Sequence, residues 1–166
     1  MQVTITINDH EVTRETEPRR LLVHFIRDTP GLTGTHWGCD TSNCGACVVL
    51  MDGQPIKSCT TLAAMCEGHE IRTVEALEVD GHLDPVQQGF HECHALHCGF
   101  CTPGMLMTSR ALLDGNPDPT ELEIRTAISG AICRCTGYKN IVAAVRWAAE
   151  HEAAMRSGPS DPGQEL

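Results

Sequence analysis

Eight of the ten cysteines in this 166-residue chain fall into two sets of four, and their spacing constrains the fold more than any other feature. The first set is spaced C-x4-C-x2-C with a fourth cysteine after eleven further residues, and the second is C-x2-C followed after thirty-one residues by C-x-C. The first set is Cys39, Cys44, Cys47 and Cys59, and the second is Cys98, Cys101, Cys133 and Cys135. Two such sites without an evident substrate site predict a chain that carries electrons and leaves the bond chemistry to a partner.

The first set predicts a 2Fe–2S cluster. Iron in such a cluster prefers soft thiolate ligands in a tetrahedral arrangement, and this spacing is the one that plant-type 2Fe–2S sites use. Gly38, Gly45 and Ala46 carry little or no side chain, so backbone N–H groups can approach the cluster sulfurs. Four thiolates also bind structural zinc, but zinc sites usually combine two C-x2-4-C pairs. Zinc is therefore the weaker alternative here.

The spacing of the second set is less diagnostic. The segment Cys98-Gly99-Phe100-Cys101 alone fits a redox dithiol, a zinc knuckle or half of an iron–sulfur site. Beside the first set, we favour a second 2Fe–2S cluster. Cys101 directly precedes Thr102-Pro103, which starts a helix, so we expect the positive end of that helix to lower the pKa of the Cys101 thiol.

The remaining cysteines and the histidines carry weaker signals. Cys66 and Cys93 fit neither set, and we expect them to be small buried apolar side chains. His91, His94 and His97 recur at every third residue, but no carboxylate accompanies them, so we do not expect a histidine metal site.

The charge balance narrows the choice of partners. A net charge of −10 and an isoelectric point near 5.2 argue against nucleic acid or an anionic membrane as the main partner. No apolar run approaches the ~18 residues of a membrane span, and the chain shows no secretory signal. Clustered thiols in a reducing compartment usually bind metal. We therefore expect a cytoplasmic protein, with peripheral association at the inner face of the membrane as an alternative.

Residues 1–76 predict a small α+β domain with a β-grasp arrangement. Apolar and polar residues alternate in two hairpins, and a glycine-punctuated loop with three cysteines lies between them. The expected elements are strands 3–7 and 11–14, a helix 21–27, strands 48–51 and 54–57, a short helix 61–65 and a strand 70–73.

Residues 77–156 predict an all-α domain that forms a four-helix bundle. Asp84-Pro85 and Thr102-Pro103 place proline in a first helical turn, and Thr120 with Glu123 forms a capping box. Helices are expected at 85–94, 102–113, 120–132 and 140–154, joined by short links. Residues 157–166 are rich in glycine and proline and predict a mobile tail.

Three segments together resemble a known family. They are residues 38–47, residues 98–104 with the sequence Cys-Gly-Phe-Cys-Thr-Pro-Gly, and residues 133–138 with the sequence Cys-Arg-Cys-Thr-Gly-Tyr. Over about residues 1–155 the chain resembles the small iron–sulfur subunit of the molybdenum hydroxylases, the xanthine oxidase family. The resemblance implies a plant-ferredoxin-like domain and a four-helix domain, each with one 2Fe–2S cluster, in the electron-transfer subunit of an oxidoreductase.

The resemblance also implies the partners. A large subunit would hold a molybdenum–pterin cofactor in its cytosine dinucleotide form, a medium subunit would hold FAD, and the chains would form a dimer of heterotrimers. Electrons would pass from the molybdenum centre through the cluster on the second cysteine set, then through the cluster on the first set, to FAD. A free-standing two-cluster ferredoxin and a zinc-stabilised interaction module are the alternatives.

Two details of the resemblance concern the substrate and the pterin. Residues 32–42 and 130–142 look most like the small subunit of aerobic carbon monoxide dehydrogenase, which implies carbon monoxide as substrate, with an aldehyde or an N-heterocycle as the alternative. The residue before Cys98 is usually a pterin-contacting glutamine in the family, whereas here it is His97, whose contact would depend on its protonation. Cys135 is the other expected pterin contact.

Overall fold

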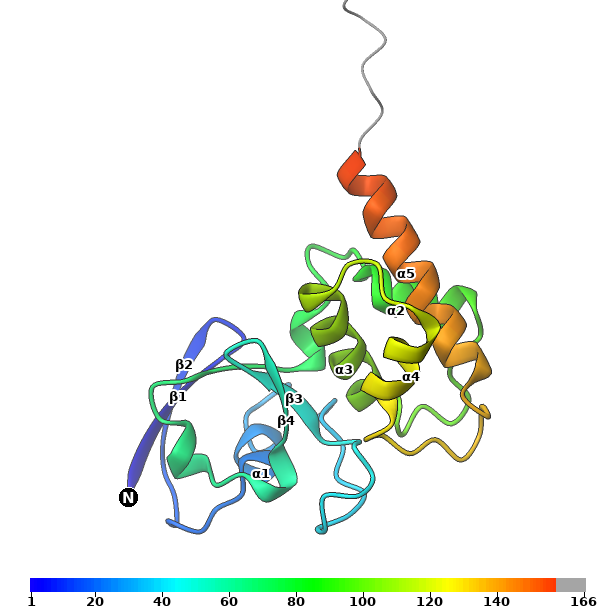
Figure 1. The fold of residues 1–166 in the computed structure, drawn as a ribbon. Coiled ribbons are helices and arrows are strands. Elements are labelled where there is room, and N and C mark those ends of the chain that lie inside the picture. Colours follow the sequence, from blue (N-terminus) through cyan, green and yellow to red (C-terminus); the bar gives the residue numbers. More distant parts are fainter. Residues whose placement is uncertain (158–166) are drawn as a thin grey trace, which may run out of the picture.

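The computed structural model describes the backbone of residues 1–157 and the side chains of residues 1–152. The first part of the chain forms a mixed sheet with the strand order β2-β1-β5-β3-β4 (Figure 1). The strands are β1 (Gln2–Ile7), β2 (His10–Glu15), β3 (Val48–Met51), β4 (Gln54–Lys57) and β5 (Glu70–Arg72). β1 and β5 are parallel, and the other neighbouring strands are antiparallel. Both predicted hairpins are confirmed.

Alternation along β1 directs its apolar side chains to the face of the sheet on which α1 (Leu22–Arg27) packs. Val3, Ile5 and Ile7 are buried there against Phe25 of α1. Burial of side chains of this size contributes about 1.5–3 kcal/mol each. Because a helix this short is unstable by itself, packing on the sheet is what holds it.

The predicted short helix at 61–65 is instead a 3₁₀ turn, Ala63–Cys66, so that prediction was wrong. The carbonyl oxygen of Thr61 accepts a hydrogen bond from the N–H of Leu22 at 2.8 Å, and Leu62 forms a β-bridge with the residue before α1. These contacts hold the segment extended, so the helical turn can start only after them.

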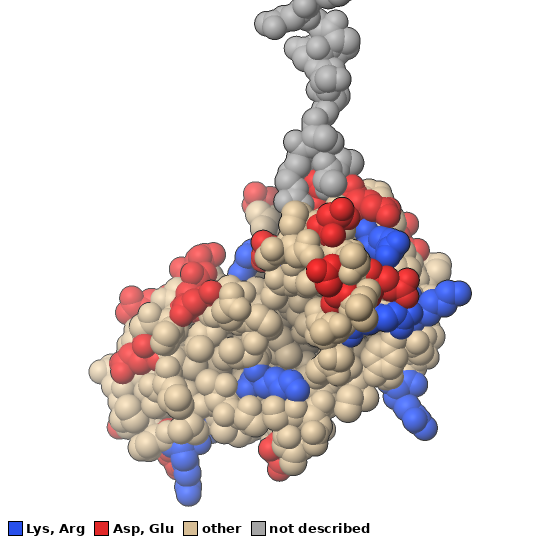
Figure 2. Space-filling view, in the orientation of Figure 1, with Lys and Arg blue, Asp and Glu red and all other residues tan. Residues whose placement is uncertain are grey.

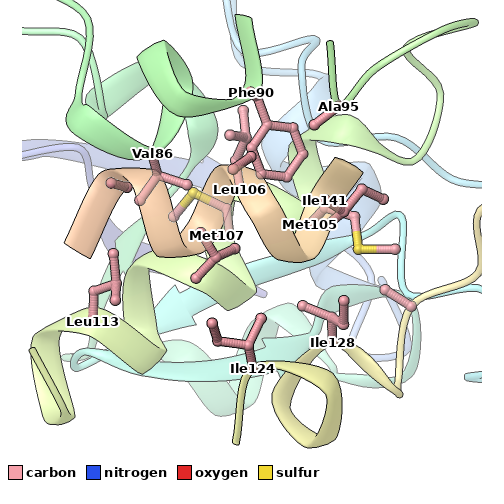
Figure 3. Close-up of a cluster of buried hydrophobic side chains, with 14 of the residues drawn as sticks. Val86, Phe90, Ala95, Met105, Leu106, Met107, Leu113, Ile124, Ile128 and Ile141 are labelled. Carbon is pink, nitrogen blue, oxygen red and sulfur yellow. The ribbon is translucent and has the colours of Figure 1, made fainter. Parts of the chain in front are cut away.

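Within the described residues, the second part of the chain forms four helices around a second apolar core (Figures 1 and 3). They are α2 (Pro85–Glu92), α3 (Thr102–Gly115), α4 (Glu121–Ile128) and α5 (Lys139–Ser157). Asp84 caps α2 by accepting from the N–H of Val86 at 2.8 Å, and Thr120 with Glu123 forms the predicted capping box of α4. The predicted α+β class, with a β-grasp part followed by a helical part, is confirmed.

Two helices end earlier than the sequence predicts. α2 stops at Glu92 rather than 94, because His94 adopts the left-handed conformation with φ of 51°. α4 stops at Ile128 rather than 132, where the N–H of Ser129 bonds the carbonyl oxygen of Thr126 in a tighter turn.

The last helix, α5, runs three residues beyond its predicted end at 154. The predicted mobile tail, residues 157–166, overlaps it at Ser157, and the rest of that segment lies outside the described residues. Among the described residues, no helix combines the length and the apolar character that a membrane span requires.

Strand β3 belongs to both apolar cores. Val49 faces the core shared with α1, whereas Val48 and Leu50 face the core of the helical part. Figure 1 shows α3 lying beside β3. The sheet is therefore covered by α1 on one face and by α3 on the other. The division into separate domains at residue 76 stays a prediction.

Buried charges join three of the helices. Arg110 of α3 is 8% exposed and pairs with Glu152 of α5 and with Asp114, whose Oδ1 lies 2.9 Å from its Nε. Its Nη1 also lies 3.5 Å from Asp84, the cap of α2. Leaving a buried charge without its partner typically costs about 3–5 kcal/mol, so this set fixes the relative positions of the three helices.

Glycines permit the closest approach between the two parts of the molecule. A Cβ atom at Gly104, in the first turn of α3, would fall well inside van der Waals contact with the carbonyl oxygen of Gly45. A Cβ atom at Gly45, where φ is +71°, would lie 2.5 Å from the carbonyl oxygen of Gly130. The first cysteine loop therefore contacts the helical part through backbone atoms.

We expect Gly104→Ala to lower the free energy of unfolding by about 1–3 kcal/mol, because the methyl group must push α3 away from the cysteine loop. Gly115→Ala, at the other end of the same helix, is the matched control, since nothing lies within 4 Å of the added Cβ atom and alanine favours a helix. Chemical denaturation followed by circular dichroism measures both. Equal stabilities of the two variants would contradict the close contact.

Candidate metal centres

The β3–β4 hairpin positions the buried half of the first cysteine set. Cys47 precedes β3, and Cys59 lies in the 3₁₀ turn that follows β4. Val48 pairs with Lys57 in the ladder, so the residues just beyond this pair lie side by side. The Ser58 hydroxyl donates to the carbonyl oxygen of Cys47 at 2.7 Å. Both thiols are buried, and they contact each other.

The other half of the first set lies in the loop before β3. The N–H of Cys44 donates to Sγ of Cys39 at 3.3 Å. Two left-handed residues bend the loop, Ser42 with φ of 62° and Gly45 with φ of 71°. Nζ of Lys57, on β4, donates to the carbonyl oxygen of Ser42 at 2.5 Å and holds the bend in place.

The second cysteine set is assembled from two links between helices. Cys98 and Cys101 lie between α2 and α3, and Cys133 and Cys135 lie between α4 and α5. The sulfur atoms of Cys98 and Cys135 are 3.5 Å apart, and the thiols of Cys101 and Cys133 also contact each other. The structure thus brings the cysteines of each predicted set together in pairs.

In both sets the thiols approach one another in pairs. The pairs are Cys39 with Cys44, Cys47 with Cys59, Cys98 with Cys135, and Cys101 with Cys133. A 2Fe–2S cluster takes two protein ligands on each iron, whereas structural zinc needs four around one ion. The donor sets therefore fit a two-iron group better than a single ion.

Two hydroxyl groups after Cys133 support the second set. Oγ1 of Thr136 donates to Sγ of Cys133 at 3.1 Å, and Oη of Tyr138 accepts from the N–H of Cys133 at 2.8 Å. The sequence places both residues in the segment of resemblance but assigns them no role. A hydroxyl residue three positions after a cysteine is the local signal that could have suggested the first contact.

The thiols of the first set differ in their protonation. Backbone N–H groups, above all that of Cys44, lower the pKa of Cys39 to about 6. Burial raises the pKa of Cys59 to about 11, and the neighbouring Cys47 thiol adds to that rise. Because metal ligation requires the thiolate, binding at this set releases the proton that Cys59 holds.

Cys101 departs from the prediction made for it. Although it stands at the N-cap position of α3, burial and the neighbouring Cys133 thiol raise its pKa to about 12. The expected lowering by the helix end was wrong, because desolvation outweighs the helix charge at this position. Burial also acts to raise the pKa of Cys133, but hydrogen bonds, first that of Thr136, lower it overall.

The other predicted residues lie as follows. Cys66 is fully buried and donates to the carbonyl oxygen of Leu62 at 3.5 Å, as expected for a structural cysteine. Cys93 is only half-buried. His97 and Cys135 are exposed beside the second set, where a partner could reach both.

The two cysteine sets meet at the junction of the two parts. The N–H of Ile132 donates to the carbonyl oxygen of Cys44 at 2.9 Å, so a chain neighbour of Cys133 is bonded to a member of the first set. Nδ1 of His36 lies 2.8 Å from the carbonyl oxygen of Phe100, which stands between the first two cysteines of the second set. Sequence spacing gave no indication of either contact.

This fold and these paired thiols define a protein with two 2Fe–2S-binding domains. Residues 5–77 match the family described as "2Fe-2S iron-sulfur cluster binding domain", and residues 73–146 match the family described as "[2Fe-2S] binding domain".

Comparison with similar proteins shows the family to which the chain belongs. The chain is 50% identical over 147 residues to caffeine dehydrogenase subunit gamma of Pseudomonas sp. (strain CBB1), with 87% of this chain and 88% of that protein covered. It is 47% identical over 145 residues to the nicotine 6-hydroxylase small subunit of Paenarthrobacter nicotinovorans, with 87% of each covered. The crystal structure of quinoline 2-oxidoreductase from Pseudomonas putida 86 matches with a TM-score of 0.88 and 45% identity, covering 95% of this chain and 97% of that one. The chain belongs to the family of small iron–sulfur subunits of the molybdenum hydroxylases, as its resemblance predicted.

Because Cys59 lies in the first set and Cys66 does not, we expect the two serine variants to differ in metal content. Cys59→Ser lowers iron from about four to about two atoms per chain, since one of two clusters is lost. Cys66→Ser, at an equally buried cysteine of the same part, keeps the full iron content. Iron and sulfide assays on the purified proteins measure this. Equal losses in both variants would contradict the grouping of the thiols.

Proposed function

We propose that the eight cysteines of the two sets ligate two 2Fe–2S clusters, with each of the four thiol pairs on one iron. The pairing of the thiols is the observation that supports this assignment. A cluster bound there takes up and releases one electron at a time. The backbone N–H of Cys44, which reaches Sγ of Cys39, stabilises negative charge on that sulfur.

The chain is the iron–sulfur electron-transfer subunit of a molybdenum-hydroxylase-type oxidoreductase. We infer that electrons enter at the second set, because Cys98 and Cys135 are exposed, whereas Cys47 and Cys59 of the first set are buried. The hydrogen bond from Ile132 to the first set provides a short bonded connection between the two sites.

We propose that two partner chains complete the enzyme, a large subunit with a molybdenum–pterin cofactor of the cytosine dinucleotide type and a medium subunit with FAD. The relatives named as a gamma or a small subunit support a multi-chain assembly, for which we propose a dimer of heterotrimers in the cytoplasm. Four large apolar side chains are exposed on or beside the cysteine loops, namely Trp37, Leu96, Phe100 and Ile132. Exposed apolar side chains of this kind favour burial by a partner. On the face seen in Figure 2, charged side chains lie mostly toward the two ends and are few in the middle.

For the substrate of the assembly we propose an aromatic N-heterocycle. Caffeine, nicotine and quinoline, which appear in the names of the similar proteins, are all nitrogen heterocycles. Carbon monoxide is the second candidate, and the resemblance of residues 32–42 and 130–142 supports it. The substrate contacts lie in the large subunit in either case.

Purification of the native assembly under anaerobic conditions tests these proposals. We expect about four iron and about four sulfide per copy of this chain, and paramagnetic signals from two clusters after reduction with dithionite. Two further chains that contain molybdenum and FAD should co-purify. Caffeine, nicotine, quinoline and carbon monoxide are then compared as reductants of the clusters. A colourless protein that contains zinc would refute the cluster assignment, and reduction by carbon monoxide alone would refute the heterocycle.

His97 is the residue that we propose as a contact to the pterin, together with Cys135. We expect His97→Gln to leave the iron content unchanged and to speed cluster reduction by substrate about fivefold, because one well-made hydrogen bond contributes about 1 kcal/mol. His91→Gln, at an exposed position on α2, is the matched control. Stopped-flow absorbance of the assembled enzyme measures the rate. The same rate in both variants would remove His97 from the pterin site.

A further inference from the structure

A histidine and a phenylalanine connect the two cysteine loops. The rings of His36 and Phe100 stack with their centroids 4.9 Å apart and their planes 20° from parallel. Nδ1 of the same histidine lies 2.8 Å from the backbone carbonyl oxygen of Phe100. A carbonyl oxygen can only accept, so Nδ1 carries the proton and donates it. One histidine therefore contacts both the ring and the backbone of Phe100.

The phenyl ring also lies against the first cysteine loop itself. A Cβ atom at Gly38 would come within 2.7 Å of Cε1 of Phe100 and within 3.4 Å of Sγ of Cys44. The absence of a side chain at Gly38, directly before Cys39, is what allows the ring to pack there. Phe100 stands between Cys98 and Cys101 in the second set, and its ring lies against the first cysteine loop at Gly38.

The histidine is held firmly on its own side of the junction. Nη1 of Arg27, at the end of α1, donates to the carbonyl oxygens of Thr33 at 2.7 Å and Thr35 at 2.8 Å. The N–H of Gly34 donates to Oε1 of Glu75 at 2.7 Å. The segment that leads to His36 is therefore fixed to α1 and to the end of the sheet.

The segment that carries Phe100 has less support of its own. His97, Cys98 and Phe100 are exposed, and Gly99 has φ of +82°, a conformation that needs glycine. Exposed loops with few buried contacts open more readily than the core, so contacts from outside the loop determine where it lies.

Each half of the second cysteine set is tied to the first loop by its own contact. The half with Cys133 is tied through the hydrogen bond from Ile132 to Cys44. The half with Cys98 and Cys101 is tied through the contact between His36 and Phe100. Together with the close backbone contact between Gly104 and Gly45, these two contacts hold the second site against the first.

We propose that His36 and Phe100 form a clasp that sets the distance between the two iron–sulfur sites, and that both are positioning residues for electron transfer between them. The proposal rests on the proposed ligation of two clusters. Electron transfer slows steeply as the gap between two centres widens, so a loop that moves away from its neighbour reduces the rate. The clasp acts on the spacing of the two sites, while the cysteines that ligate each cluster remain the same.

The test uses three variants of the assembled enzyme. His36→Ala removes both the stacking and the hydrogen bond, His36→Phe keeps the stacking alone, and His91→Ala is the control for loss of an exposed histidine elsewhere. Three quantities are measured in each variant. They are the iron and sulfide content, the magnetic splitting between the two reduced clusters, and the hydrogen–deuterium exchange of the peptide with residues 97–101. Loss of one hydrogen bond of about 1 kcal/mol predicts about fivefold faster exchange of this peptide in His36→Ala.

We expect His36→Ala to keep the full iron content, to show weaker magnetic splitting and to transfer electrons more slowly between the clusters. His36→Phe should lie between this variant and the unmodified enzyme, and the control should match the unmodified enzyme. Unchanged splitting and exchange in His36→Ala would overturn the clasp. If His36→Ala loses iron, the magnetic splitting and the hydrogen–deuterium exchange of His36→Phe test the clasp instead, and unchanged values in that variant would overturn it. Missing clusters in the unmodified enzyme would instead refute the proposed ligation, so the two failures are distinguishable.

Discussion

The structure depends on bringing thiols together in pairs from segments that are far apart in the chain. In the first set, the β3–β4 ladder brings Cys47 and Cys59 together, because Cys47 directly precedes the Val48–Lys57 pair and Cys59 lies in the 3₁₀ turn that follows it. In the second set, the packed helices bring the cysteines together, because they hold the link between α2 and α3 beside the link between α4 and α5. Regular secondary structure therefore supplies the rigidity, and the loops supply the sulfur atoms. Free thiols at such distances gain little from each other, so a bound inorganic group would add to the hydrogen bonds that hold these irregular loops.

The junction between the two parts is packed by apolar side chains and by close backbone contacts. Val48 and Leu50 of β3 extend the helical core into the sheet, and the glycines at 45 and 104 let two backbones meet without side chains between them. A hinge at this position would change the distance between the two cysteine sites with every motion. An apolar core that crosses the junction limits such motion, which suits an electron-transfer subunit with two 2Fe–2S-binding domains.

The local features of this molecule were predictable from sequence, and the long-range ones were not. Alternation gave the hairpins, capping residues gave the helix starts, and cysteine spacing gave the two sets. The extended segment before the Ala63–Cys66 turn was missed because contacts with α1 override its apolar pattern. The raised pKa of Cys101 was missed because burial depends on which helices cover the residue. The contact of His36 with Phe100 joins residues 64 positions apart, and no periodic pattern reports such a pair.

The uneven exposure of the two sets has a consequence for their redox behaviour. A reduced cluster carries one more negative charge than an oxidised one, and removal of water from around it disfavours that extra charge. Cys98 and Cys135 are exposed in the isolated chain, whereas Cys47 and Cys59 are buried by their own domain. A partner that covered the second site would therefore shift its potential more than that of the first site.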